Sequence, residues 1–338
     1  MNARLTPEHE ALAVAPLRVA YQSEPMAQTL TRIDALAAIA FHTRDPVPED
    51  PRALHLALAG GQAPPLEVWQ AEGPVRAGRS GRVRHAASAD WQFCALELDE
   101  AAFDGDIAAT TEAAYSELAQ FQQHSGHRHL IRIWNYLDAI TQGEGDAERY
   151  RQFCIGRARG LGARDDCFPA ATAIGRRDGR RSLQVYWLSS RVPGLSIENP
   201  RQVSAFRYPR CYGPQPPSFS RGCVVAAAGG AQLFISGTAA VVGHESRHPG
   251  RLREQLLETV GNLEALLAAA AQRHPELGDR FGTGTILKVY LREPEATQEA
   301  EALLRERLPA GVALLLLEAD ICRADLLIEI DGIHRGVA

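Results

Sequence analysis

Lysine is almost absent from this chain of 338 residues: Lys288 is the only one, so arginine carries nearly all of the positive charge. The net charge of −5 gives no overall attraction to nucleic acid, and no basic cluster alternates with aromatic residues as on a nucleic-acid surface. An anionic ligand would therefore have to be bound by guanidinium groups, which donate paired hydrogen bonds to carboxylates. This composition argues against a nucleic-acid partner.

Long apolar runs are also missing, so no segment is expected to span a bilayer. We therefore expect no membrane partner. The N-terminal residues MNARLTPEHE lack the apolar segment of a signal peptide. The six cysteines are scattered without a C-x-x-C pair, which is typical of free thiols in a reducing compartment. We therefore expect a cytoplasmic protein.

Motifs for metals and nucleotides are weak. His124, His127 and His129 straddle an expected helix end and a loop, and no nearby acid or cysteine completes a metal site. The segment GTGT at 282–285 precedes a strand instead of a helix and lacks a P-loop lysine. The segment SFSRG at 218–222 does not match the serine-hydrolase motif G-x-S-x-G. We expect a solvated turn at the histidines, a turn at the glycines and no metal.

The length suits two domains, and the hydrophobic pattern predicts β-α-β-α-β twice. Such halves pack helices on one face of a mixed sheet, which predicts the α+β class. We divide the chain into a first unit (1–192), a connection (193–223) rich in Pro, Arg and Tyr, and a second unit (224–338); residues 1–80 are expected to form a sheet region with hairpins. The expected strands are 91–98, 129–140, 183–189, 232–242, 285–291 and 312–317, and the expected helices are 106–123, 147–161, 251–272 and 297–308.

The second unit closes with a strand-length apolar run, 326–330, that contains one carboxylate, Glu329. Strand side chains alternate, so Leu326, Ile328 and Ile330 share one face while Leu327 and Glu329 share the other. Burial without a charged partner would raise the pKa of Glu329 and leave a protonated acid able to donate. Alternation alone leaves a second interpretation open, an edge strand whose Glu329 points into water.

Two clusters combine arginine with tyrosine. The first, ERYRQFCIGRARG at 148–160, contains Arg149, Tyr150 and Arg157, and the second, RYPRCYG at 207–213, contains Arg210 and Tyr212. The first is also compatible with a solvated helix face. The second lies in a long irregular connection, where ordered side chains often serve ligands. Two arginine clusters would suit a small substrate with two carboxylates.

Eight segments between about residue 85 and residue 332 carry a family resemblance: HLIRIWNYLDAI, ERYRQFCIGRA, FPAATAIG, ENPRQVSAFRYPRCYGP, PSFSRG, FISGTA, VVGHESRHPG and DICRADLLIEIDG. In these segments, which occur in the same order, the chain resembles the chorismatase family. The C-terminal half also resembles the broader Rid/YjgF family, which implies two Rid-like units in one chain.

The resemblance implies an enzyme that splits chorismate into pyruvate and a cyclic acid, without metal or organic cofactor. The family's catalytic glutamate corresponds to Glu329, the general acid that would protonate the enolpyruvyl ether. The resemblance also implies a set of residues that would contact the substrate: Arg149, Tyr150, Arg157, Arg210, Tyr212 and Gly237.

Cys322 stands where hydroxybenzoate-forming members of the family carry cysteine and hydrolytic members carry alanine. The resemblance thus implies 3- or 4-hydroxybenzoate as the product, because a bulkier thiol would exclude the attacking water. An ordinary buried thiol is the alternative for Cys322. For the chain as a whole, the alternatives are chorismate hydrolysis to a dihydroxycyclohexadienoate, a Rid-type enamine/imine deaminase, and a ligand-binding module without catalysis. The sequence leaves the oligomeric state open between monomer and trimer.

Overall fold

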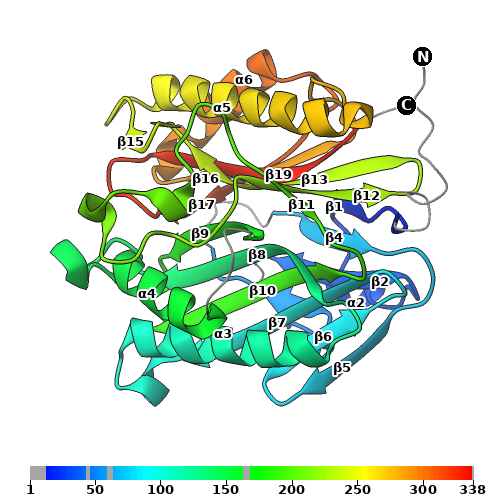
Figure 1. Ribbon diagram of the computed structural model, residues 1–338. Helices are drawn as coiled ribbons and strands as arrows, with labels where there is room; N and C mark the ends of the chain where they lie inside the picture. Colours follow the sequence, from blue (N-terminus) through cyan, green and yellow to red (C-terminus); the bar gives the residue numbers. More distant parts are fainter. Residues whose placement is uncertain (1–12, 43–45, 59–63, 163–167, 337–338) are drawn as a thin grey trace.

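Two large β-sheets face each other in the computed structural model, and each carries helices on its outer side (Figure 1). The structure describes residues 13–42, 46–58, 64–162 and 168–336. In Figure 1 the helices α5 (Leu252–Arg273) and α6 (Thr297–Arg307) lie above, and α3 (Ile107–His124) and α4 (Arg149–Leu161) lie below. The sheets therefore enclose a common interior between two helical layers.

The seven-stranded sheet comes almost entirely from the first half of the chain. Parallel pairing of β8 with β9 among antiparallel neighbours makes it a mixed sheet. Helices α3 and α4 cover its outer face through Tyr115, Leu118 and Phe153. Its spatial order is β18 (Asp320–Ile321), β9 (Ala170–Arg176), β8 (His129–Asp138), β10 (Ser182–Ser190), β7 (Trp91–Asp99), β6 (Val83–Ala87), β5 (Arg76–Ser80).

The six-stranded sheet comes from the second half of the chain, and it is also mixed because β16 and β17 run parallel. Leu256, Val260, Leu263 and Leu267 recur at helical spacing on α5 and pack onto this sheet. Its spatial order is β11 (Leu195–Ile197), β12 (Gly222–Ala227), β13 (Gly230–Ala239), β19 (Ile328–Arg335), β16 (Thr285–Leu291), β17 (Ala313–Glu318).

A third, four-stranded sheet closes the common interior. Trp69 of this sheet shares one hydrophobic core with Trp134 and Tyr186 of the seven-stranded sheet and with Phe234 and Tyr290 of the six-stranded sheet. The order of this sheet is β1 (Arg18–Gln22), β4 (Leu66–Gln70), β2 (Ala35–Ala40), β3 (Ala53–His55), and the remaining short elements are α2 (Met26–Thr29), β14 (Val241–Val242) and β15 (Glu245–Ser246).

The predicted α+β class with mixed sheets is confirmed, and each predicted helix is present to within about two residues. The sequence did not predict β9, although it forms part of the interior, and the connection 193–223 contains β11 and the start of β12. Strand β18 belongs to the second half of the chain but pairs with β9 of the first. The two halves are thus joined by shared sheet as well as by the connection.

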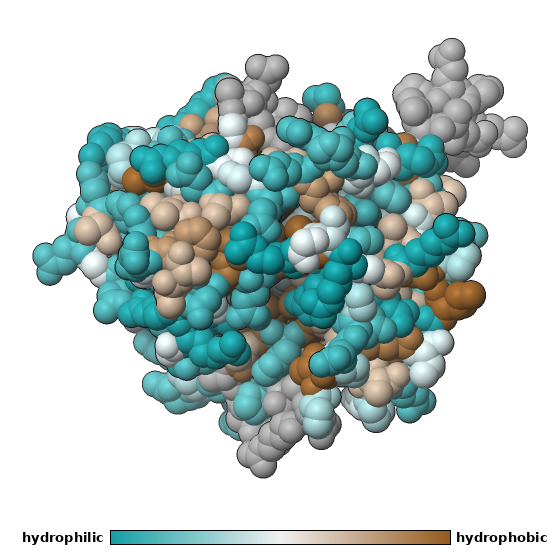
Figure 2. Space-filling model, turned by 90° about the horizontal axis from the view of Figure 1, so that it is seen from below, coloured by the Kyte–Doolittle hydropathy of each residue, from teal (hydrophilic) through white to brown (hydrophobic). Residues whose placement is uncertain are grey.

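The surface carries few large apolar side chains: Ile33 and Leu257 are the two exposed ones in the described ranges. On the face shown in Figure 2, hydrophobic residues form small groups scattered among hydrophilic ones. None of the described helices has the length and apolar character that crossing a membrane would require.

Candidate functional site

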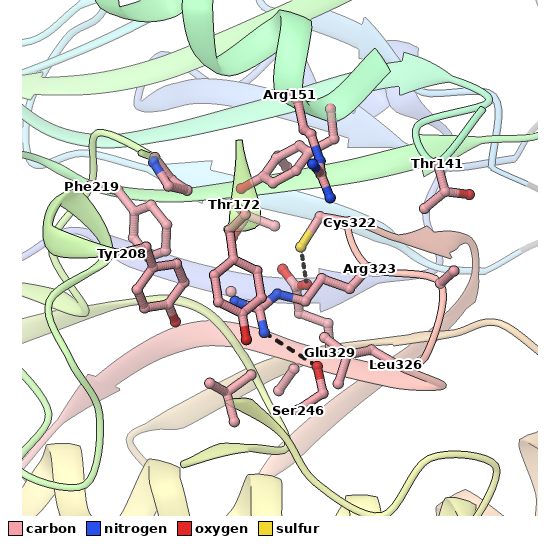
Figure 3. A pocket seen from close by; sticks show the side chains of 18 of the residues that line it. Thr141, Arg151, Thr172, Tyr208, Phe219, Ser246, Cys322, Arg323, Leu326 and Glu329 are labelled. Atoms are coloured by element: carbon pink, nitrogen blue, oxygen red, sulfur yellow. Dashed lines mark hydrogen bonds between the residues drawn. The ribbon is translucent and has the colours of Figure 1, made fainter. Parts of the chain in front are cut away.

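A cavity of about 460 Å³ lies where the two halves of the chain meet (Figure 3). Its walls come from α4, β9, the connection between 202 and 221, β13, the segment 322–326 and β19. This volume lies within the range of roughly 300 to 1,000 Å³ typical of small-molecule sites. Polar and charged side chains converge on one part of it, which makes it the candidate active site.

Strand β19 carries Glu329 into this cavity. β19 lies inside its sheet, with Ala239 of β13 on one side of Glu329 and Tyr290 of β16 on the other. The neighbours Ile328 and Ile330 pack toward the helical layer, so Glu329 faces the opposite way, toward the seven-stranded sheet. Only 4% of Glu329 is exposed. The alternative of an exposed edge strand is therefore wrong.

The carboxyl of Glu329 has few hydrogen-bonding groups around it. Its one hydrogen-bond contact among the described residues is the Cys322 thiol, whose Sγ lies 3.9 Å from Oε2 (Figure 3). Burial, and secondly the negative charge of Asp331, raise the pKa of Glu329 to about 8, although Arg132, Arg221 and Arg323 act to lower it. Glu329 is consequently protonated at neutral pH and can act as a proton donor.

Gly237 leaves the space that the Glu329 side chain occupies. The pairing of β13 with β19 shifts register between Ile235 and Thr238, and Gly237 lies in this bulge. A Cβ atom at position 237 would lie 1.9 Å from Oε1 of Glu329 and 3.3 Å from Cγ2 of Thr172. The bulge thus brings the backbone close to the acid, and Gly237 lines the cavity.

Two other carboxylates line the cavity, and both have partners. Glu148 forms an ion pair of 3.3 Å with Arg151, and burial raises its pKa while Arg151 opposes that effect. Asp325 accepts a hydrogen bond of 3.0 Å from the Ser246 hydroxyl. Glu329 differs from both because its one hydrogen-bond contact among the described residues is a neutral thiol.

Arg157 of α4 is the predicted arginine that the structure does bring into the cavity. It is 3% exposed, and its Cζ lies 5.2 Å from the centre of the Tyr115 ring. Its Nε and Nη2 find no hydrogen-bond acceptor among the described residues. A buried guanidinium with unused donors is a suitable group to bind a carboxylate.

Three further arginines, Arg151, Arg221 and Arg323, line the cavity and were not predicted as site residues. Arg151 is the partner of Glu148. Arg221 donates to the Val203 carbonyl (2.9 Å) and the Tyr208 hydroxyl (2.6 Å), while its buried Nε finds no acceptor among the described residues. Arg323 donates to the His244 carbonyl (2.9 Å) and lies against the ring of Tyr212, 4.1 Å from its centre. Both guanidinium groups are therefore fixed in place by the connection and its neighbours.

The structure places two predicted arginines outside the cavity. Arg149 is bound to the buried carboxylate of Glu100, with contacts of 3.0 and 2.6 Å. Arg210 is exposed and forms an ion pair with Asp146, with Nη1 2.9 Å from Oδ1. Each guanidinium already has a carboxylate partner within the chain, so the expectation that these two arginines hold the substrate requires correction.

The predicted tyrosines do line the cavity. Tyr150 is partly buried, and burial raises its pKa well above the ordinary value. Tyr212 packs against Tyr208 with ring centres 5.4 Å apart, and both rings contact Arg323. Together these rings give the cavity aromatic walls beside its guanidinium groups.

The metal interpretation of the histidines finds no support in the geometry. His127 contacts the Ser88 carbonyl, and His124 contacts the Gln120 carbonyl on its own helix. In the described part of the chain, His, Cys, Asp and Glu residues form no group of three or more that could hold a metal ion.

Comparison with known proteins assigns this chain to a family. Residues 67–189 match the family model described as "Chorismatase FkbO/Hyg5-like, N-terminal". A "3-hydroxybenzoate synthase" of Streptomyces hygroscopicus is 34% identical over 281 residues, which cover 80% of this chain and 81% of that protein. A crystal structure of a chorismatase matches with a TM-score of 0.83 and 29% identity, over 95% of this chain and 99% of the other.

A partial match also exists to the YjgF gene product of E. coli, at 18% identity and a TM-score of 0.30, over 42% of this chain and 98% of that one. The longer matches decide the assignment, because they cover 80% and 95% of this chain and so include parts of both of its halves. By fold and by sequence, the chain belongs to the chorismatase family.

Proposed function

We propose that this chain cleaves chorismate to pyruvate and hydroxybenzoate, with Glu329 as the general acid. The observation that carries the proposal is a buried carboxyl, protonated at neutral pH, in a cavity that also holds the guanidinium groups of Arg157, Arg221 and Arg323. An acid with a pKa near the working pH is what proton transfer to a weakly basic carbon requires.

Chorismate carries a ring carboxylate, an enolpyruvyl ether with a second carboxylate, and a hydroxyl next to the ether. Protonation of the enol methylene turns the ether into a good leaving group, and the bond between the ring carbon and the ether oxygen then breaks. If the neighbouring hydroxyl displaces the leaving group, it releases its proton and its oxygen bridges two ring carbons. One of these two C–O bonds then opens, the oxygen takes up a proton, and the carbon that keeps the oxygen loses its hydrogen as a proton, which makes the ring aromatic. Pyruvic acid and hydroxybenzoic acid together contain the same atoms as chorismic acid, so the reaction consumes neither water nor an oxidant.

The charges of the cavity suit this dianionic substrate. Apart from Arg151, which is paired with Glu148, three arginines line the cavity for two substrate carboxylates. The two buried ones, Arg157 and Arg221, retain N–H donors without an acceptor among the described residues. Binding the carboxylates by these fixed donors would hold the enol methylene against Glu329, which lowers the entropic part of the barrier. The aromatic rings of Tyr150, Tyr208 and Tyr212 offer apolar surface to the six-membered ring.

Cys322 is proposed to decide the product more than the rate. Its Sγ lies 3.9 Å from the Glu329 carboxyl, on the rim of the space where the ether would break. Burial, and secondly Glu329, raise the pKa of Cys322, so the thiol is neutral and acts through its volume and weak polarity.

We expect Cys322→Ala to shift the products from hydroxybenzoate toward dihydroxycyclohexadienoate, because the smaller side chain admits a water molecule beside the reacting carbon. Chromatography of the products at several degrees of conversion measures the ratio. The exposed Cys211 supplies a matched control, and Cys211→Ala should leave the ratio at the wild-type value. An unchanged ratio in Cys322→Ala would refute the steric explanation.

The experiment that tests the proposed function is incubation of the purified protein with chorismate, with pyruvate and aromatic acid both quantified. One pyruvate for each hydroxybenzoate is expected, with no added metal or cofactor. Pyruvate accompanied by the dihydroxy diene would instead assign the hydrolytic reaction. Binding of chorismate without pyruvate would favour a ligand-binding module, and ammonia release from an enamine substrate would favour a deaminase.

A further inference from the structure

Asp331 lies two residues beyond Glu329 on the same face of β19. It is next to the cavity, because Thr172, which lines the cavity, donates a hydrogen bond to it. It is fully buried, and the residue opposite it on β16 is Lys288, the only lysine of the chain. Asp331 is not among the residues that line the cavity. Both carboxyl groups thus lie between the two large sheets: Glu329 lines the cavity, and Asp331 lies outside its lining.

The surroundings of these two carboxyl groups are opposite in kind. Glu329 has only a thiol, whereas four donors converge on one oxygen, Oδ2, of Asp331. Hydrogen bonds and a cation at a carboxylate favour its charged form. These donors are Thr172 Oγ1 (2.9 Å), Trp134 Nε1 (3.1 Å), Tyr290 OH (3.2 Å) and Arg132 Nη2 (3.2 Å).

The other oxygen of Asp331 faces Lys288, whose Nζ lies 3.9 Å from Oδ1 and 3.0 Å from Oε2 of Glu67 on β4. Burial acts to lower the pKa of Lys288, but Asp331 and Glu67 raise it above its ordinary value, so Lys288 stays charged. The remaining titratable groups around Asp331 are Tyr21, Tyr136 and Tyr186, and burial raises the pKa of each. The two cations, Arg132 and Lys288, therefore balance the two anions, Asp331 and Glu67.

The groups that face Glu329 are mostly cationic. Arg132 from β8, Arg221 from the connection and Arg323 from the 322–326 segment all favour the loss of its proton. Cys322 beside it and Tyr150 from α4 are neutral groups, because burial raises the pKa of both. Asp331 is the anionic group that opposes the three arginines.

We propose that Asp331 is a positioning residue, whose negative charge, fixed by Arg132 and Lys288 beneath the cavity, keeps the proton on Glu329. The inference rests on the proposed function, since it concerns the acid of that reaction. Asp331 acts only through Glu329: it does not touch the substrate, and it donates no proton itself. The sole lysine thereby gains a role, because it helps to hold the charge of Asp331.

The test compares wild type with Asp331→Asn, which keeps the shape of the side chain and removes its charge. Infrared spectroscopy of the substrate-free protein detects the protonated carboxyl of Glu329, and loss of its band in Glu329→Gln assigns it. In Asp331→Asn this band should disappear on titration at a pH lower by about one unit or more, the scale of a neighbouring charge. For a shift of about one unit, kcat/KM on chorismate should be near wild type at pH 6 and about tenfold lower at pH 9.

Trp134→Phe is the matched control, because it removes one donor to the same Asp331 oxygen while the charge stays. Its titration midpoint should remain within a few tenths of a unit of wild type. An equal shift in both variants would assign the effect to packing and overturn the proposal. An unchanged midpoint in Asp331→Asn, or an activity loss of the same size at every pH, would also overturn it.

If Asp331→Asn does not fold, the wild-type protein still decides the question. Isotopic labelling of all aspartates should leave the protonated-carboxyl band at neutral pH unmoved, since the proton belongs to Glu329. A band that moves with the aspartate label at neutral pH, in wild type but not in Glu329→Gln, would show a proton shared with an aspartate and refute the proposal. The infrared titration needs no turnover, so failure of the proposed chorismate reaction would be seen separately.

Discussion

Glu329→Gln is expected to lower kcat on chorismate by roughly two to four orders of magnitude, the usual contribution of a general acid. Glutamine keeps the length and planar shape of the side chain, so the close approach to Gly237 and the cavity volume are retained. The amide cannot transfer a proton to the enol methylene. Substrate binding should therefore survive while turnover falls.

Pyruvate release measures the loss, and titration calorimetry with chorismate measures binding. Glu148→Gln is the informative comparison, because Glu148 lines the same cavity but is paired with Arg151. It should lose far less activity than Glu329→Gln. A Glu329→Gln protein that retains more than about a tenth of the wild-type kcat, a loss below the range of a general acid, would mean that the proton comes from another group.

Arg157→Met should lower kcat/KM by about thirtyfold or more. A charged hydrogen bond contributes about 2 kcal/mol, and this free energy corresponds to that factor in transition-state stabilisation. The guanidinium is buried with two N–H groups that find no acceptor among the described residues, so a substrate carboxylate would satisfy them. Methionine fills much of the same volume, which limits the loss of packing against Tyr115.

Arg159→Met controls for a change of arginine on the same helix. Arg159 is exposed and makes only a long ion pair of 3.5 Å with Glu112. This variant should keep kcat/KM within about a factor of two, because exposed ion pairs contribute little. Equal values of kcat/KM for the Arg157→Met and Arg159→Met proteins would remove Arg157 from the proposed carboxylate site.

The strand around Glu329 could be predicted from sequence because its cause is local: a single acid stands in a strand-length apolar run, with Ile328 and Ile330 alternating against it. Alternation alone left both a buried and an exposed Glu329 open, and the family resemblance favoured the buried position that the structure shows. What the sequence could not supply is the second carboxylate. Asp331 follows within the same strand, but its partners Trp134 and Thr172 lie 197 and 159 residues away.

The arginines show most clearly what a local sequence pattern cannot predict. Arg149 and Arg210 lie in sequence segments similar to those of the arginines that line the cavity. Glu100, 49 residues from Arg149, and Asp146, 64 residues from Arg210, accept their hydrogen bonds instead. Arg221 lies in the cavity although its segment SFSRG suggested no ligand. Whether an arginine is free to bind substrate depends on which distant carboxylate the fold brings to it, and a local pattern does not contain that information.

The secondary structure likewise includes elements that a local pattern predicts and elements that depend on tertiary contacts. Helix α5 was predicted to within about one residue because its leucine stripe repeats at helical spacing. Strand β9 was not predicted, since AATAIGR is rich in alanine and glycine, which are depleted in strands. Its strand character comes from parallel pairing with β8, a tertiary contact made 38 residues apart at Arg132 and Ala170.

The pH dependence of kcat/KM for the wild-type protein tests the central claim most directly, because it reports the pKa values of the free enzyme. The active form carries the proton on Glu329, and the pKa of Glu329 is raised to about 8, so activity is present below that pH and is lost as the pH rises through it. The account predicts a plateau near neutral pH and a decline with a midpoint near 8, absent from the residual rate of Glu329→Gln. A decline centred near the ordinary glutamate value of about 4.3, or a rate that stays constant well above pH 9, would contradict it.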